Sequence, residues 1–137
     1  MSRVLVVDDE PSLLQVLKMN LELEGHEAFL ASDGGTALKR IVAEEPDLVL
    51  LDIMMPVMDG WDVLRNLSEM PLKKKPRVIV MTAKGMRDMS KGLELGAHAY
   101  ISKPFDTEEL LELVENLLQT PMDELEKIRT SHTEASN

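Results

Sequence analysis

The sequence contains no cysteine, which excludes disulfides and thiolate metal sites. Aromatic residues account for only 3% of the chain, so the core has to be built from aliphatic residues and methionine. Long hydrophobic runs are also absent near the start. The first apolar run covers residues 4–7 and ends at two aspartates, which is too short for a signal peptide or a membrane span. We therefore expect a cytoplasmic protein without membrane insertion.

Basic residues are outnumbered by acidic ones, 15 to 25, and the net charge is −10. Such a balance argues against general binding to nucleic acids and to anionic membrane surfaces. The 137 residues suit one domain and are enough to bury a sizeable core. The apolar fraction of 44% and the charged fraction of 29% are typical of globular proteins.

Five short apolar runs alternate with five helical patterns. The runs cover residues 4–7, 28–31, 48–51, 78–81 and 100–101 with their flanks. The first, third and fourth are nearly continuous Val, Ile and Leu, as in strands buried on both faces of a parallel sheet. The alternation predicts an α/β protein with a doubly wound, five-stranded parallel sheet.

Apolar residues at helical spacing mark the predicted helices. The stripes are Leu13, Val16, Leu17 and Leu21; Ala37, Leu38, Ile41 and Val42; Val63, Leu64 and Leu67; Met86, Met89 and Leu93; and Leu110, Leu113, Val114, Leu117 and Leu118.

We assign residues 1–120 to one domain. Residues 121–137 form a polar C-terminal tail, expected to be partly helical or disordered, with one loose helix around Leu125. Three lysines at 73–75 are expected in a solvated loop.

Polar side chains follow the apolar runs at the points where the strands should end. Asp8 and Asp9 follow the first run, Asp52 the third, Thr82 the fourth and Lys103 the fifth. In an open parallel sheet, ligands bind beyond the carboxyl ends of the strands. Each residue alone is more often a cap, a turn or a surface group. Because all five should lie at the same end of one sheet, together they predict a ligand-binding site there.

The expected chemistry of this site follows from its charges. Two carboxylates about 5 Å apart repel by roughly 3 kcal/mol at an effective dielectric constant of ~20, so three of them hold a proton or recruit a cation. Oxygen ligands without His or Cys favour Mg²⁺. Lys103 would add positive charge where phosphoryl oxygens would lie. Met54, Met55 and Met58 are interpreted as gap-filling residues beside the site, and the three histidines as surface or packing residues.

Four ordered segments resemble the response-regulator receiver domain: residues 4–11 (VLVVDDEP), 50–60 (LLDIMMPVMDG), 81–83 (MTA) and 96–105 (GAHAYISKPF). The resemblance covers residues 1 to about 120. It implies the flavodoxin-like receiver fold with strand order 2-1-3-4-5. It also implies a phosphoacceptor signalling domain that catalyses its own phosphorylation and dephosphorylation but is a substrate more than an enzyme.

The resemblance assigns roles to the matching residues. Asp52 would be the phosphoacceptor. Asp9 and Asp52 would bind Mg²⁺ by their carboxylates, with the backbone carbonyl of Met54 as a third ligand. Asp8 would act largely through a metal-bound water, and Lys103 would pair with the phosphoryl group.

The remaining implications concern switching and partners. Thr82 would move toward the phosphoryl group and Tyr100 would turn inward, while the Lys103–Pro104 bond would be cis. The donor would be a phosphohistidine of a histidine kinase or a histidine phosphotransfer protein. The connection between the fourth strand and the fourth helix would close by way of Thr82. The face made by the fourth helix, fifth strand and fifth helix would then change shape and regulate a downstream protein.

Some positions depart from the pattern of transcriptional family members. Where many have two acidic residues before the tyrosine, this chain has His98 and Ala99; the last helix carries Glu112, Glu115 and Asn116 in place of arginines, although Lys91 remains. We therefore expect a monomer or weak dimer. A tail of this length is too short for a DNA-binding domain, so no nucleic-acid partner is expected.

Two residues flank the path of a water that would hydrolyse the phosphoryl group, Met54 and Lys84, two positions after Asp52 and Thr82. Neither positions water well, which predicts a phosphoryl form that lasts many minutes.

Two other functions would fit the same fold class. A Mg²⁺-dependent phosphohydrolase with an aspartyl-phosphate intermediate would typically have a second aspartate at position 54, which is methionine here. A flavin-binding module would need a hydroxyl- and glycine-rich phosphate loop after the first strand, where this chain has Asp-Asp-Glu-Pro.

Overall fold

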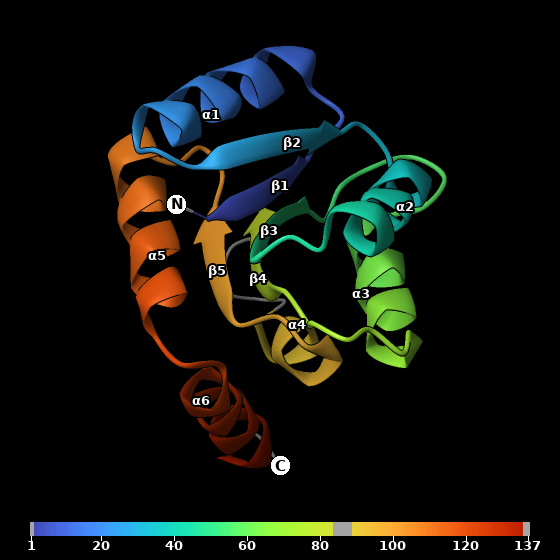
Figure 1. The fold of residues 1–137 in the computed structure, drawn as a ribbon. Helices are drawn as coiled ribbons and strands as arrows, with labels where there is room; N and C mark the ends of the chain where they lie inside the picture. The colour runs from blue at the N-terminus through green and yellow to red at the C-terminus, as the bar shows by residue number, and fades with distance from the viewer. Residues whose placement is uncertain (1, 84–88, 136–137) are drawn as a thin grey trace.

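The protein, described from a computed structural model over residues 2–83 and 89–135, has a parallel sheet at its centre (Figure 1). The strands are β1 (Arg3–Val7), β2 (Glu27–Ala31), β3 (Leu48–Asp52), β4 (Arg77–Thr82) and β5 (Ala99–Ser102). All four neighbouring pairs are parallel. The strand order is β2-β1-β3-β4-β5, which confirms the predicted doubly wound, flavodoxin-like topology.

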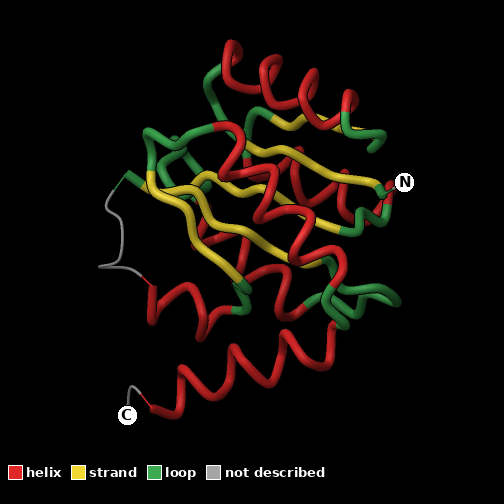
Figure 2. Tube along the Cα trace, turned by 90° about the vertical axis from the view of Figure 1, so that its left-hand side faces the viewer, coloured by secondary structure: helices red, strands yellow, loops and turns green. Residues whose placement is uncertain are grey.

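Helices cover both faces of this sheet (Figures 1 and 2). They are α1 (Pro11–Leu23), α2 (Gly34–Glu44), α3 (Gly60–Glu69), α4 (Met89–Leu95), α5 (Thr107–Gln119) and α6 (Met122–Ala135). Buried residues of α1 and α5 form one hydrophobic cluster with the sheet, and those of α2 and α3 form the other. The helix α4 packs beside α3 and α6.

The central strands are buried as their sequences predict. All five residues of β3 are buried, and in β1 and β4 only the first residue is partly exposed. The edge strand β5 is only partly buried. The continuous Val, Ile and Leu runs therefore mark strands with a helix layer on each face.

The helical stripes are correct in outline but wrong in two members. The buried residues of α1 are Leu14, Leu17 and Leu21, whereas Val16 is 45% exposed. In α2, Val42 is 57% exposed. Each misplaced valine is the neighbour of a buried residue in the sequence, since Val16 precedes Leu17 and Val42 follows Ile41. A helix turns about 100° per residue, which carries the next side chain off the buried face.

Polar side chains fix the starts of three helices. Asp33 accepts a hydrogen bond from the Thr36 amide at the start of α2, and Asp106 accepts one from the Glu108 amide at the start of α5. Asp59 and Asp62 form a reciprocal capping box on α3. Asp106 is thus the N-cap of α5.

The C-terminal tail contains one helix, α6, over residues 122–135. The helix is docked rather than loose, because Leu125 is buried in the cluster formed with α1 and α5. The predicted stripe of the fourth helix is only partly covered, since Met86 and the neighbouring Lys84 lie outside the described residues. Within the described ranges, the helices are too short or too polar to cross a membrane.

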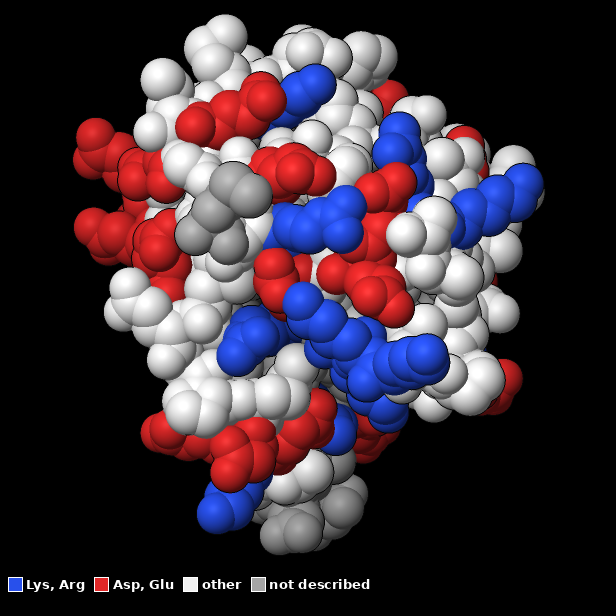
Figure 3. Space-filling model, viewed as in Figure 1, with Lys and Arg blue, Asp and Glu red and all other residues white. Residues whose placement is uncertain are grey.

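Acidic side chains dominate parts of the surface. In the view of Figure 3, acidic side chains gather on the left and at the lower left, over α5 and α6. Lys and Arg side chains extend from the centre toward the right. In the predicted solvated loop, Lys74 pairs with Asp47. Arg3 forms ion pairs with Glu27 and Glu44. The basic groups described here are thus partly neutralised by carboxylates.

Candidate functional site

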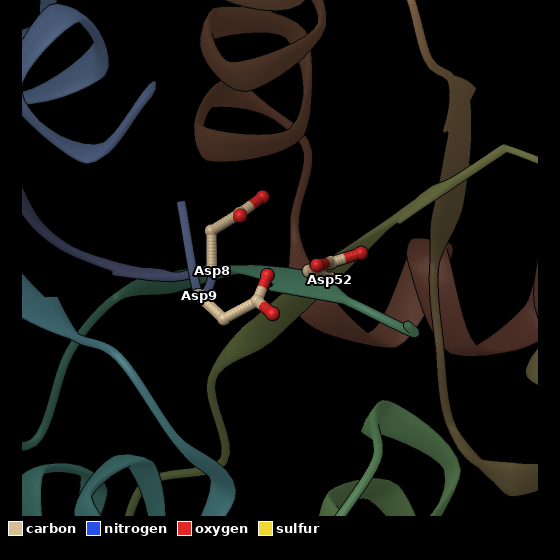
Figure 4. Close-up of side chains that lie close together, drawn as sticks. All are labelled: Asp8, Asp9 and Asp52. Carbon is tan, nitrogen blue, oxygen red and sulfur yellow. The ribbon is translucent and has the colours of Figure 1, made fainter. Parts of the chain in front are cut away.

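Three aspartates meet where β1 and β3 end (Figure 4). Val7 pairs with Leu51 in the sheet register, so Asp8 and Asp52 follow neighbouring points of the two strands. One carboxylate oxygen from each of Asp8, Asp9 and Asp52 can be chosen so that all three lie within 4.8 Å of one another. Asp8 and Asp52 are buried and Asp9 is exposed. The parallel sheet therefore gathers these carboxylates at one edge.

Lys103 reaches the same cluster from the end of β5. Its ammonium nitrogen lies 2.5 Å from Asp8 Oδ2 and 3.6 Å from Asp52 Oδ2. The backbone amide of Lys103 donates a hydrogen bond to the Thr82 carbonyl at 2.8 Å, which continues the β4–β5 pairing to the site. The Lys103–Pro104 bond is cis, as the resemblance implied.

Thr82 and Tyr100 occupy the two strands on the α4 side of the site. Thr82 is the last residue of β4, is fully buried, and pairs in register with Ser102. The ring of Tyr100 packs against Gly92 of α4. A Cβ atom placed on Gly92 would lie 3.0 Å from the ring and from the phenol oxygen. Tyr100 is therefore seated on the backbone of α4.

The loop between β3 and α3 forms another wall of the site. The Met54 amide donates a hydrogen bond to Asp52 Oδ1 at 3.2 Å, while the Met54 side chain is 56% exposed. Met55 is buried and Met58 is partly buried against the core, so the gap-filling interpretation holds for these two and not for Met54.

Gly60 lets this loop close tightly. A Cβ atom at Gly60 would lie 2.6 Å from the Asp52 carbonyl oxygen and 2.7 Å from the Ile53 Cα. The start of α3 therefore rests directly on the backbone of the Asp52 strand. In the same loop Val57 has a φ of 69° and a fully exposed side chain, a conformation that β-branched residues rarely adopt.

The cluster changes the ionisation of its members. Burial, together with the neighbouring Asp8 carboxylate, raises the pKa of Asp52 to about 6, although Lys103 and the Met54 amide oppose this rise. Burial alone would lower the pKa of Lys103. Its hydrogen bond to Asp8 and the charge of Asp52 outweigh that effect, so the pKa of Lys103 is raised. The lysine is therefore a permanent positive charge beside a carboxyl group that titrates near neutrality.

The donor set of the cluster fits a hard divalent cation. It offers three carboxylates and neither imidazole nor thiolate, which suits Mg²⁺ better than Zn²⁺ or Cu²⁺. Among residues 2–83 and 89–135, no other group of three or more His, Cys, Asp and Glu residues is placed so that it could hold a metal ion. Asp9, as the exposed member, leaves one side of the cluster open to solvent.

Sequence reasoning placed Asp8, Asp9, Asp52, Thr82 and Lys103 at one edge, and they lie there. It did not anticipate that Lys103 would pair most closely with Asp8. Nor did it anticipate the two close backbone approaches at Gly60 and Gly92, for which the glycines themselves were the available signal.

Two histidines that were interpreted as surface or packing residues are buried hydrogen-bonding groups. The side chains of His26 and His98 are 7% and 3% exposed, and they bond to Glu115 and Glu126. Both are distant in sequence from the strand-end carboxylates, and neither belongs to the potential metal cluster.

Comparison with known proteins identifies the relatives of this fold and site. Residues 4–115 match the response regulator receiver domain family. A CheY-like receiver domain protein from Methanospirillum hungatei is 34% identical, with a TM-score of 0.79, and the match covers 93% of this chain and 98% of that one.

Two further structures agree with this match. A response regulator from Chloroflexus aurantiacus is 32% identical with a TM-score of 0.78, covering 87% of this chain and 98% of the other. The receiver domain of a signal-transduction histidine kinase from Syntrophus aciditrophicus is 32% identical with a TM-score of 0.77, covering 88% and 96%. The chain therefore belongs to the response-regulator receiver domain family, the signalling domains that accept phosphoryl groups from histidine kinases.

Proposed function

We propose that Asp52 is the phosphoacceptor of this receiver domain and that its phosphorylation requires Mg²⁺. The observation that carries this proposal is the convergence of Asp8, Asp9, Asp52 and Lys103. Asp52 is the carboxylate of this group that ends a fully buried strand and also faces a lysine. Asp9 is exposed, and Asp8 is held by Lys103 and by the Glu10 amide.

The reaction transfers a phosphoryl group from a nitrogen to an oxygen. An Asp52 carboxylate oxygen forms a bond to phosphorus while the bond from phosphorus to the donor histidine nitrogen breaks, and the electron pair of that bond stays on the imidazole. The attacking carboxylate has to be ionised. With a pKa of about 6, most of Asp52 is ionised at pH 7.5. Lys103 offers its ammonium group to the phosphoryl oxygens.

Asp8, Asp9 and Asp52 would hold the metal ion, with the Met54 carbonyl as a further ligand. A bound Mg²⁺ supplies positive charge that offsets repulsion between the carboxylates and the phosphoryl oxygens. Asp8 contributes to this site while paired with Lys103, and the Met54 amide holds one Asp52 oxygen in place. The other oxygen, Asp52 Oδ2, lies on the side of Lys103.

The output is proposed to lie on the face formed by α4, β5 and α5, hereafter the switch face. Thr82 ends β4 next to the site, and Tyr100 of β5 contacts α4. Phosphorylation would shift a two-state equilibrium of these residues and so change the surface presented to a downstream partner protein. The protein is proposed to act in the cytoplasm as a monomer or weak dimer, without nucleic-acid binding of its own.

Phosphotransfer profiling tests this proposal. The histidine kinases and histidine phosphotransfer proteins of the source organism are labelled and offered to the wild type, to Asp52→Asn and to a matched control, Asp123→Asn, an exposed aspartate in the first turn of α6. We expect at least one donor to label the wild type and the control rapidly and the Asp52 variant not at all. Equal labelling of the Asp52 variant would overturn the assignment.

A further inference from the structure

The C-terminal helix α6 is fastened to the switch face by a defined set of contacts. It runs beside α4 (Figure 2). Its Leu125 side chain is 8% exposed and lies in the cluster built from α1 and α5. The guanidinium of Arg129 donates to the Leu93 carbonyl in α4 at 2.7 Å and pairs with Glu126 at 2.6 Å. The helix is thus anchored by one apolar and several polar contacts.

A histidine ties the same helix to the starts of β4 and β5. The Val78 amide donates to His98 Nδ1 at 3.1 Å, so Nδ1 is an acceptor and the ring proton sits on Nε2. Nε2 then donates to Glu126 at 3.0 Å. Glu126 therefore links Arg129 on its own helix to the buried ring of His98, whose side chain is 3% exposed.

Three consecutive residues of α4 contact three different elements. The Lys91 ammonium lies 4.8 Å from the centre of the Trp61 ring in α3. Gly92 receives the Tyr100 ring of β5. The Leu93 carbonyl accepts the hydrogen bond from Arg129 of α6. The contact of Tyr100 and the contact of α6 are therefore one residue apart on a seven-residue helix.

This arrangement couples α6 to the residues proposed to switch. Hydrogen bonds weaken steeply with distance and angle, so a displacement of the α4 backbone by about 1 Å is enough to break the bond from Arg129. Gly92, on which the Tyr100 ring lies, and Leu93, whose carbonyl holds Arg129, are neighbours in the same turn of α4. A movement of this turn that accompanied a rearrangement of Tyr100 would therefore also displace the anchor of α6.

We propose that α6 is a latch on the switch face that is released when Asp52 is phosphorylated, by way of the shared turn of α4. This inference rests on the proposed function, in which phosphorylation of Asp52 shifts the equilibrium of Thr82 and Tyr100. Release would expose the surface of α4 that α6 covers, so the latch would control access of the downstream partner to the α4 part of the switch face. The undocked helix is also free to enter a new contact.

Hydrogen exchange of the α6 amides tests the latch. The full chain is compared in Mg²⁺ with and without beryllofluoride, a mimic of the phosphoryl group. We expect exchange of residues 122–135 to become about fivefold faster or more when beryllofluoride binds, the range of typical allosteric couplings. In Arg129→Ala the helix should already exchange fast, and beryllofluoride should add little. Lys127→Ala, an exposed residue of the same helix, should behave as the wild type.

Reciprocity supplies a second readout. If beryllofluoride weakens the docking of α6, then weakening the docking must tighten the binding of beryllofluoride by the same factor. Arg129→Ala should therefore bind beryllofluoride about fivefold more tightly or more, and Lys127→Ala should be unchanged. Equal affinity of Arg129→Ala and the wild type would overturn the latch.

The two proposals fail in distinguishable ways. Phosphoramidate labelling, read as the gain in intact mass of the wild type that is missing from Asp52→Asn, reports on Asp52 independently of α6. If Asp52 is labelled while exchange of α6 stays the same with and without beryllofluoride, the latch is wrong and the proposed function stands. If Asp52 is labelled by neither phosphoramidate nor any kinase, the proposed function is wrong and the latch falls with it.

Discussion

The Lys103 ammonium lies 2.5 Å from a carboxylate oxygen of Asp8, closer than its 3.6 Å distance to Asp52. Asp8 is fully buried, so this lysine is the positive charge that makes its burial tolerable. The same ammonium is the proposed partner of the phosphoryl group. Lys103 thus offsets the negative charge of Asp8 before the reaction, and it is in place to offset the charge of the phosphoryl group afterwards.

Replacing Lys103 should therefore destabilise the fold and not only slow the reaction. We expect Lys103→Met to lower the free energy of unfolding by about 3 kcal/mol in metal-free buffer, because Asp8 stays buried without its partner. Urea unfolding with EDTA measures this loss. Added Mg²⁺ should recover part of the stability, since a second cation then faces the carboxylates. An equal loss with and without Mg²⁺ would speak against a shared cation site.

The pKa of Asp52 predicts a pH-dependent effect of Asp52→Asn. The folded-state pKa is about 6, above the ordinary value of 3.8. The folded state thus binds the proton more tightly than the unfolded state, so ionised Asp52 costs stability above pH 6, and the cost fades as the pH falls from 6 toward 3.8.

The neutral variant should accordingly be more stable than the wild type at pH 8 in EDTA, by up to about 3 kcal/mol for a shift of this size. The difference should shrink at pH 5. Urea denaturation at the two pH values checks this. If the variant is less stable than the wild type at pH 8, ionised Asp52 does not destabilise the folded state.

Val57 is expected to store backbone strain without a packing gain. Its φ of 69° lies in the left-handed region, which costs a β-branched residue about 1–2 kcal/mol, and its side chain is fully exposed. Val57→Asn should therefore raise the free energy of unfolding by about 1 kcal/mol, because asparagine tolerates this conformation. Val42→Asn, an exposed valine inside α2, is the matched control and should give no gain. Thermal unfolding distinguishes them.

The exposed Met54 thioether predicts a slowly hydrolysed phosphoryl form, lasting many minutes. Its side chain lies beside the phosphoacceptor, is 56% exposed, and cannot position a water. Met54→Asn should shorten the lifetime severalfold, because an amide can hold a water in line with phosphorus. The measurement is the decay of the phosphorylated mass after the donor is removed. Loss of the wild-type label within seconds would refute this view.

The sheet and the acidic cluster could be predicted because both follow from short stretches of sequence. Buried parallel strands are continuous apolar runs, and the residue after each run must lie at the carboxyl edge. That logic placed Asp8, Asp52 and Thr82 correctly. The apolar pattern was less informative about which face of a helix is buried. In α1 it predicted Val16 as a buried residue and missed Leu14.

The contacts of α6 could not be predicted in the same way. Its anchors are an arginine on a backbone carbonyl and a glutamate on a buried histidine, and neither leaves a periodic apolar signal. The apolar signal of this helix is limited to Met122, Leu125 and Ile128, of which Leu125 is buried and Ile128 is 48% exposed, so it did not fix a docking surface. The close fit of Tyr100 on Gly92 also depends on how α4 is placed, which local sequence does not determine.

The most direct test of the account is to locate the phosphoryl group. The protein is incubated with phosphoramidate and Mg²⁺, the acyl phosphate is reduced with borohydride, and the peptides are mapped by mass spectrometry. We predict one modified residue, Asp52, and no modification when EDTA replaces Mg²⁺. Modification at another residue, or equal modification of Asp52 in EDTA, would contradict a metal-assisted phosphoacceptor built from the ends of β1, β3 and β5.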